Sequence, residues 1–246
     1  MEVSFLKDAI DRVAEMAKPF TFEFAGRQFC SAELHEIRPE VDFPARYSVD
    51  TLDALVKLIR TEGAHYSPLL YVRVDSARQV MVDTTYTHRD YAEYSRLPLY
   101  EAVTDVPSIS INQSISQERA VVELQSLYAV TPDRDYLLSL LSRIDVNQGV
   151  SSVDNGISQE VSVRTGAVLK EQQTVQPIVL LQPYRTFLEV EQPASDFLLR
   201  LDKEGHPALY EADGGAWKLE AKRNIAAYLG EQLADLVESG KVVVMI

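Results

Sequence analysis

The segment from 216 to 246 constrains the fold more than any other part of the chain. Apolar residues recur at the helical period along its first part: Trp217, Ala221, Ile225, Leu229, Leu233 and Leu236. This period predicts the buried face of one long helix, and Gly240 predicts where the helix ends. The apolar run VVVMI at 242–246 then predicts a final strand buried in a sheet. A buried strand needs partners, so earlier parts of the chain must supply the sheet.

Two helices are predicted near the N-terminus. The segment 3–17 carries one apolar stripe, formed by Val3, Leu6, Ile10, Val13 and Ala17. The segment 48–63 begins with Ser48 or Asp50 as a capping residue and reaches Gly63, which predicts its end. Its predicted buried face consists of Leu52, Leu55, Val56 and Ile59.

Two more helices are predicted side by side in the sequence, at 116–130 and 131–145. Thr131 serves as the N-cap of the second. Pro132 then takes the first helical position, where its missing N–H is tolerated.

Strand patterns lie between the helices. The segment 20–30 predicts a hairpin that turns at Ala25 and Gly26, and 68–86 predicts two strands joined at 75–77. A further strand at 91–99 contains Pro98, which ends it or confines it to a sheet edge. Strand patterns in the second half lie at 157–169, 177–190 and 196–212. The sequence therefore predicts an α+β fold of mostly antiparallel sheets with several packed helices.

A loop rich in Asn, Ser and Gly at 147–156 is the best candidate for a domain boundary. It divides the chain into an N-terminal α+β half, 1–146, and a C-terminal α+β half, 157–246. The alternative is one continuous domain.

The acidic balance disfavours two classes of partner. The formal charge of −13 comes from acids dispersed along the chain, which disfavours general binding to nucleic acid and to anionic membranes. An acidic surface that imitates DNA is an alternative. The apolar runs are too short to cross a bilayer. The single cysteine, Cys30, and the absence of a signal-peptide pattern predict a cytoplasmic protein.

The start of the C-terminal helix is the main candidate site. Asp213 can cap it, and Gly214 and Gly215 are expected to leave its first N–H groups open. Cations then lie at the N-terminal end of the helix, where the helix dipole favours anions. Acidic residues lie at the C-terminal end, where the dipole favours cations. The cations at this start are Lys218, Lys222 and Arg223.

Two interpretations of this inverted charge order stay open. In one, the amides and cations bind a phosphate or carboxylate, with Trp217 stacked on a base. In the other, acids such as Glu211, Glu220, Glu189 or Glu191 neutralise the cations, and Trp217 belongs to the core.

A second polar cluster, QPYRTF at 182–187, places Tyr184 and Arg185 between apolar strands. It either joins the anion site or forms an edge strand with a solvated Arg185. The candidate ligand-binding residues are therefore Tyr184, Arg185, Gly214, Gly215, Trp217, Lys218, Lys222 and Arg223.

Motifs for catalysis and for cofactors are absent from the sequence. Neither the phosphate-binding G-x-x-x-x-G-K-[ST], the dinucleotide-binding G-x-G-x-x-G nor the hydrolase G-x-S-x-G occurs. The histidines are scattered, without the paired spacing of zinc ligands. We expect no cofactor, no metal and no enzymatic activity, although a missing motif does not exclude an unrecognised active site.

The stretches QPYRTFLEVEQPASDFLLRL and LYEADGGAWKLEAKRNIAAYL resemble an uncharacterised family of proteins encoded by tailed phages and prophages, similar to the YfdQ-like group. The resemblance transfers no functional residues. It implies a protein made in the cytoplasm of an infected bacterium. One expectation is then a binding protein that sequesters an anionic, nucleotide-type defence signal. The other is an acidic interaction protein, which binds a host protein, forms a homo-oligomer, or serves phage assembly or replication as an accessory or DNA mimic.

Overall fold

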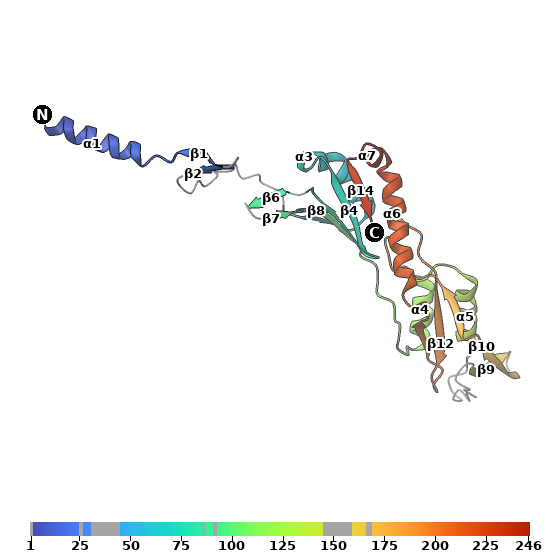
Figure 1. The fold of residues 1–246 in the computed structure, drawn as a ribbon. Helices are drawn as coiled ribbons and strands as arrows, with labels where there is room; N and C mark the ends of the chain where they lie inside the picture. The colour runs from blue at the N-terminus through green and yellow to red at the C-terminus, as the bar shows by residue number, and fades with distance from the viewer. Residues whose placement is uncertain are drawn as a thin grey trace. The chain divides into compact units, whose positions relative to one another are not determined.

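A computed structural model describes residues 2–24, 27–30, 45–85, 87–90, 93–144, 159–165 and 169–246. The chain forms two compact units, Met1–Phe43 and Pro44–Ile246. Both contain helices and strands (Figure 1), and the α+β prediction is confirmed.

The first unit consists of a helix and a strand pair. Helix α1 spans Glu2–Met16, and β1 (Thr21–Phe24) pairs antiparallel with β2 (Arg27–Cys30). The helix at 3–17 and the two strands of the hairpin are thus confirmed. The predicted turn residues, Ala25 and Gly26, lie outside the described residues.

The larger unit contains a five-stranded sheet in the order β14-β4-β5-β8-β3. Its central strands run antiparallel, whereas each edge strand runs parallel to its neighbour. The bounds are β3 Tyr47–Val49, β4 Leu70–Ser76, β5 Gln79–Asp83, β8 Pro98–Val103 and β14 Val242–Met245. Between β5 and β8 the chain forms a separate hairpin of β6, Thr87–Asp90, and β7, Glu93–Ser95.

Two strand predictions need correction. Pro98 neither ends a strand nor lies at an edge, because it is the first residue of β8, which pairs on both sides. The first position of a strand tolerates the missing N–H. The final strand β14 lies at the edge of the sheet, so Val242 is buried while Val243 and Ile246 are exposed.

Two groups of helices pack against this sheet. Helix α2 (Leu52–Leu58) contacts β8, and α6 (Ala216–Gln232) contacts β4, β14 and α2 (Figure 1). The buried positions match the predicted faces of both helices, except that Leu236 is half-buried. A short helix, α7 (Ala234–Glu238), follows α6 and ends before Gly240, whose φ of 70° confirms the predicted stop.

The ends of the α2 region differ from the prediction. The N-cap is Thr51, whose hydroxyl accepts the Ala54 N–H, and not Ser48 or Asp50. Gly63 does not end the helix, because the chain continues through a π-helical turn, η1 (Ile59–Gly63), into α3 (Ala64–Tyr66). Close packing explains the glycine at position 63 instead, because a Cβ there would lie 2.6 Å from Leu70 Cδ1.

A second layer joins a three-stranded antiparallel sheet to two helices. Strands β11 (Ile178–Leu181), β12 (Ser195–Leu201) and β13 (Pro207–Glu211) lie in sequence order. Helices α4 (Gln117–Ser126) and α5 (Pro132–Arg143) lie beside them (Figure 1), with Thr131 capping α5 as predicted. Their shared core includes Leu124, Leu137, Leu140, Val179, Phe197 and Leu199. Strands β9 (Gln159–Thr165) and β10 (Leu169–Val175) form a further antiparallel pair.

The predicted boundary at 147–156 lies outside the described residues, so it stays a prediction. The two halves nevertheless share one sheet, since β14 from the second half pairs with β4 from the first.

Candidate functional site

The first amides of α6 are occupied by the protein itself. The carboxylate of Asp213 accepts the Gly215 N–H at 2.9 Å and the Trp217 N–H at 3.2 Å. The next amides also have acceptors, with Ala216 donating to the Asp213 carbonyl and Lys218 to the Gly215 carbonyl. The open amides expected from the sequence are therefore absent at these positions, and this part of the predicted anion site is wrong.

The Gly-Gly pair explains how Asp213 reaches back. Gly214 and Gly215 have φ values of 64° and 82°, a left-handed conformation that favours glycine. These dihedrals turn the chain so that the carboxylate lies over the helix start. Burial opposes ionisation of Asp213, but the hydrogen bonds from Gly215, Ser195 and Trp217 lower its pKa below the ordinary value. The ionised Asp213 carboxylate thus lies at the positive end of the α6 dipole, where an anion is stabilising.

Arg185 lies in the interior, not at a solvated edge and not in an open site. Its side chain is only 2% exposed, and Nη1 donates to Glu211 Oε1 at 2.9 Å. Nη2 donates to the Ser195 hydroxyl, and that hydroxyl in turn donates to Asp213 at 2.9 Å. Burial lowers the pKa of Arg185 to about 10, so the group stays charged at neutral pH. Both interpretations of Arg185 drawn from the sequence are therefore wrong.

Trp217 belongs to the core. It is 8% exposed, and the guanidinium carbon of Arg185 lies 3.7 Å from the centroid of its ring. A nucleotide base cannot stack on a face that Arg185 already covers. Tyr184 is half-buried, and its amide donates to the Leu127 carbonyl at 2.9 Å.

The segment 182–194 connects these groups to the five-stranded sheet, a role that the sequence pattern did not reveal. The Thr186 hydroxyl donates to the Ala77 carbonyl in the β4–β5 turn, and Arg78 Nε donates to the Arg185 carbonyl at 3.2 Å. The side-chain oxygen of Gln192 accepts the amides of Arg185 and Thr186 at 3.0 and 3.2 Å. The only sequence signal was the clustering of polar residues between two apolar strands.

The same segment also reaches two helices. Glu189 Oε1 accepts the Leu52 N–H at the start of α2, at 2.7 Å, and the Glu191 carbonyl accepts Asn224 Nδ2 of α6 at 2.9 Å. Segment 182–194 is therefore a structural junction that connects α2 and α6 with the five-stranded and the three-stranded sheets.

An open cleft of about 550 Å³ lies beside this junction, where the β4–β5 turn faces the first turns of α6. Its polar and charged lining comes from both elements. The lining residues are Asp75, Ser76, Ala77, Arg78, Trp217, Lys218 and Lys222. The cleft therefore collects two of the three predicted cations and adds Arg78, whereas the exposed Arg223 does not line it.

The cations of the cleft lack carboxylate partners. Within the part of the chain that the structure describes, neither Arg78, Lys218 nor Lys222 has a carboxylate oxygen within 4.0 Å. Asp75, the one acid of the lining, is held by Arg73 at 2.5 Å. Two of the four acids expected to neutralise the cations are engaged elsewhere, Glu211 with Arg185 and Glu189 with the Leu52 amide. The ion-pair network predicted for the helix start therefore does not include Lys218 or Lys222 among the described residues, whereas Glu211 pairs with Arg185, for which the sequence predicted no acidic partner.

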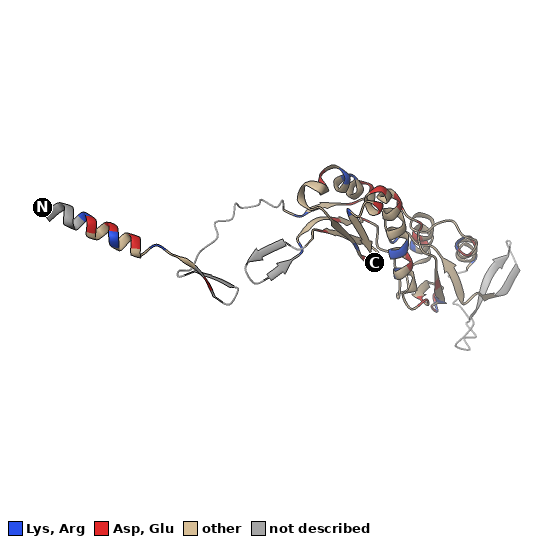
Figure 2. Cartoon of the chain, turned by 45° about the horizontal axis from the view of Figure 1, so that its top comes forward, with Lys and Arg blue, Asp and Glu red and all other residues tan. Residues whose placement is uncertain are grey.

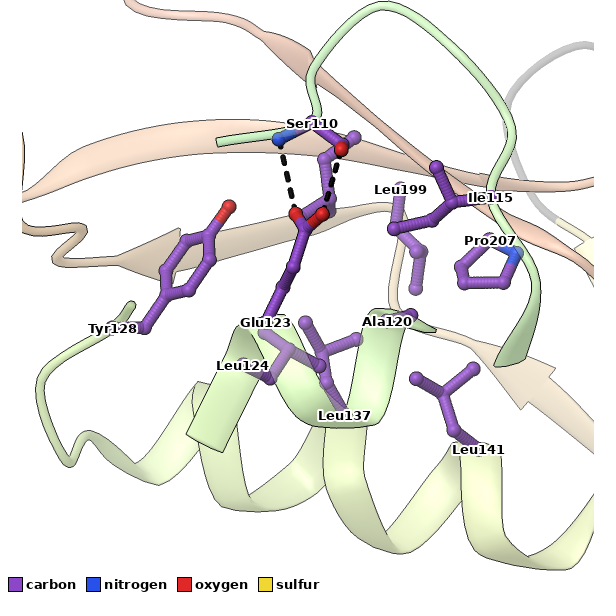
Figure 3. A pocket seen from close by; sticks show the side chains of 11 residues that line it. Ser110, Ile115, Ala120, Glu123, Leu124, Tyr128, Leu137, Leu141, Leu199 and Pro207 are labelled. Atoms are coloured by element: carbon purple, nitrogen blue, oxygen red, sulfur yellow. Dashed lines mark hydrogen bonds between the residues drawn. The ribbon is translucent and has the colours of Figure 1, made fainter. Parts of the chain in front are cut away.

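A second hollow lies between α4, α5 and the three-stranded sheet (Figure 3). Its volume of about 20 Å³ is room for roughly one water molecule. Glu123 accepts the Ser110 N–H at 3.0 Å and the Ser110 hydroxyl at 2.7 Å. Burial opposes ionisation of Glu123, yet these bonds and Arg119 lower its pKa. This hollow is too small for an organic ligand.

The described residues contain no group of three or more His, Cys, Asp or Glu side chains placed to hold a metal ion. Likewise, none of the helices among them has the length and apolar character needed to cross a membrane. Among the described residues, acidic positions are spread over elements of both units, including several on α1 (Figure 2).

Comparison of the chain with protein-family models, curated proteins and solved structures finds no match. The resemblance to the phage and prophage family therefore stays a prediction.

Proposed function

We propose that the chain binds a phosphate-bearing small molecule in the cleft between the β4–β5 turn and the start of α6. The supporting observation is that three cations there, Arg78, Lys218 and Lys222, have no carboxylate partner among the described residues, on a chain whose formal charge is −13. Acids outnumber bases in the chain as a whole, so cations without acidic partners at one open cleft favour an external anion.

The chemistry of the lining indicates how the anion is held. Lysine ammonium groups act as point charges toward phosphate, and Arg78 adds a planar donor. The Ser76 hydroxyl offers a further donor, although it already accepts the Arg78 N–H at 3.1 Å. Recognition is therefore mainly electrostatic and directed at phosphate rather than at a base. Affinity should fall steeply with salt, since exposed charges are screened within about 10 Å at 0.1 M ionic strength.

The test is a calorimetric titration with pyrophosphate and with a panel of linear and cyclic nucleotides at low ionic strength. Lys218→Ala and Lys222→Ala should each weaken binding roughly 10-fold, as expected for loss of one charge-assisted hydrogen bond. Arg223→Ala is the matched control, because it removes one cation of the same helix outside the cleft. If no compound of the panel binds, the proposal is wrong. If all three variants lose affinity equally, the binding reflects general charge attraction rather than a site in the cleft.

The biological role that we propose follows from the resemblance to phage proteins. A non-enzymatic binding protein in the cytoplasm of an infected cell would sequester a nucleotide-type defence signal. Unchanged nucleotide after prolonged incubation, read by chromatography, is the expected result. Turnover would instead indicate an enzyme.

A further inference from the structure

Helix α1 presents an apolar face without a described partner. Each of the side chains from Lys7 to Met16 is exposed. Ile10, Val13 and Met16 are 60%, 66% and 83% exposed. Exposed apolar side chains in a contiguous stripe mark an interaction surface more often than scattered single residues do.

The stripe follows a heptad spacing. Positions 3, 6, 10, 13 and 17 alternate steps of three and four residues, which are the a and d positions of a coiled coil. In this register Ala9 and Met16 occupy g positions beside the stripe. Apart from Glu2 at g, the charged residues of α1 fall outside a, d and g: Lys7, Asp8, Asp11, Arg12 and Glu15. Figure 2 shows blue and red positions along α1, separated by uncharged stretches.

We propose that α1 pairs with α1 of a second copy of this chain as a parallel two-stranded coiled coil. β-Branched residues at a and Leu at d favour this arrangement, and the register places Val3 and Ile10 at a and Leu6 at d, followed by Val13 at d and Ala17 at a. It also places Glu2 at g and Lys7 at the following e, the positions that pair opposite charges between parallel helices. The sequence thus offers charge complementarity with itself.

The charge of α1 disfavours an anionic membrane as the occupant. The helix has four acids, Glu2, Asp8, Asp11 and Glu15, against two bases, Lys7 and Arg12, a net charge of −2. Helices that lie on anionic membranes carry an excess of Lys and Arg on the polar face. A second copy has the matching apolar stripe.

The pairing is weak, because α1 has only 15 residues and helices of that length are marginal in isolation. Self-association should therefore depend on protein concentration. Sedimentation velocity of the full chain across a hundredfold concentration range should show a monomer–dimer equilibrium. The double variant Ile10→Glu with Val13→Glu should remain monomeric over the whole range.

The control is Arg12→Glu, which changes the net charge by the same −2 but lies outside the predicted stripe. It should dimerise within about twofold of the original chain. A chain that is monomeric throughout, or an Arg12→Glu variant as impaired as the double variant, overturns the proposal.

A cross-linking experiment tests the direction of pairing. In a Cys30→Ser background, Val13→Cys should form a disulfide-linked dimer on mild oxidation, because equivalent d positions face each other in a parallel pair. Asp11→Cys, on the outer face, should not. No selective cross-link at position 13 contradicts the parallel arrangement, including the case in which α1 instead covers the chain's own larger unit.

Discussion

The guanidinium of Arg185 lies over the ring of Trp217, with its central carbon 3.7 Å from the ring centroid. The two residues come from the segment after β11 and from the first turn of α6. Ser195, Glu211 and Asp213 surround the same guanidinium, so one buried cation organises the start of α6. Trp217 is the single tryptophan of the chain, so its fluorescence reports on this contact during unfolding and ligand binding.

Arg185→Met should lower the free energy of unfolding by about 3 kcal/mol, because it leaves the carboxylates of Glu211 and Asp213 without their buried cation. The value lies at the low end for a broken buried pair, since the Glu211 side chain is 25% exposed. Urea unfolding followed by Trp217 fluorescence measures it.

The double variant Arg185→Met with Glu211→Gln serves as its control. Removing the acid together with the cation should recover part of the lost stability, as expected when both charges of a pair leave together. If Arg185→Met alone leaves the urea midpoint unchanged, the network does not stabilise the fold.

Asp213→Asn should flatten the acid limb of the stability curve. Burial opposes ionisation of Asp213, but hydrogen bonds lower its folded pKa below the ordinary 3.8. The unfolded chain therefore binds a proton first as pH falls, and stability present above about pH 4 is lost as pH drops through the folded pKa. Asn loses the titration and keeps one acceptor oxygen, but its NH2 group cannot accept the hydrogen bonds that Oδ2 receives from Ser195 and Trp217, so its stability at pH 7 should also be lower.

Urea midpoints measured from pH 7 to pH 2.5 give the comparison. The original chain should lose more stability below pH 4 than the Asn variant does. Glu220→Gln, an exposed carboxylate on the same helix, should leave the curve in place. Parallel curves for the original chain and Asp213→Asn would contradict the role of this carboxylate.

Local patterns predicted much of the fold. Thr131 and Pro132 mark a helix start whatever lies around them, and Gly240 marks an end because it adopts a φ of 70°. Gly63 gave a wrong prediction for a physical reason. Its small size serves a contact with Leu70 across a turn, and single-residue propensity does not distinguish close approach from a helix stop.

The candidate site was predicted less well, because its geometry depends on distant segments. The proximity of Lys218 and Lys222 follows from helical spacing, but Arg78 joins them from a turn far earlier in the chain. Nothing in the local pattern shows that Arg185 is buried, since its partners at 195, 211 and 213 meet it only after β12 and β13 pair. Asp213 was predicted as a cap, yet the sequence did not show that it satisfies two amides at once.

Thr186→Val should destabilise the junction between segment 182–194 and the β4–β5 turn. The substitution keeps the shape but removes the donor to the Ala77 carbonyl, where Thr186 is fully buried. An unsatisfied buried carbonyl lowers stability by about 1–3 kcal/mol. Amide exchange at Ala77 and Arg78 should also accelerate. Thr61→Val, which removes an exposed hydroxyl bonded within its own helix, should change stability by less than about 0.5 kcal/mol.

Two glycine-to-alanine substitutions should have opposite signs. Gly230 lies inside α6, and a Cβ there meets no atom within 4 Å, so Gly230→Ala should stabilise by about 0.5–1 kcal/mol through helix propensity. Gly63→Ala should gain a similar stabilisation from the higher helix propensity of Ala. Its Cβ, however, would lie 2.6 Å from Cδ1 of the buried Leu70, and overpacking a core costs about 1–3 kcal/mol.

The net expectation for Gly63→Ala is destabilisation by roughly 1 kcal/mol, the difference between these two terms. Urea midpoints of both variants, read by Trp217 fluorescence, decide the matter. The combination Gly63→Ala with Leu70→Val should recover part of the loss, because Val lacks the Cδ1 atom that the new methyl group meets. If Gly63→Ala stabilises the chain as Gly230→Ala does, Leu70 moves aside freely and close packing does not explain the glycine.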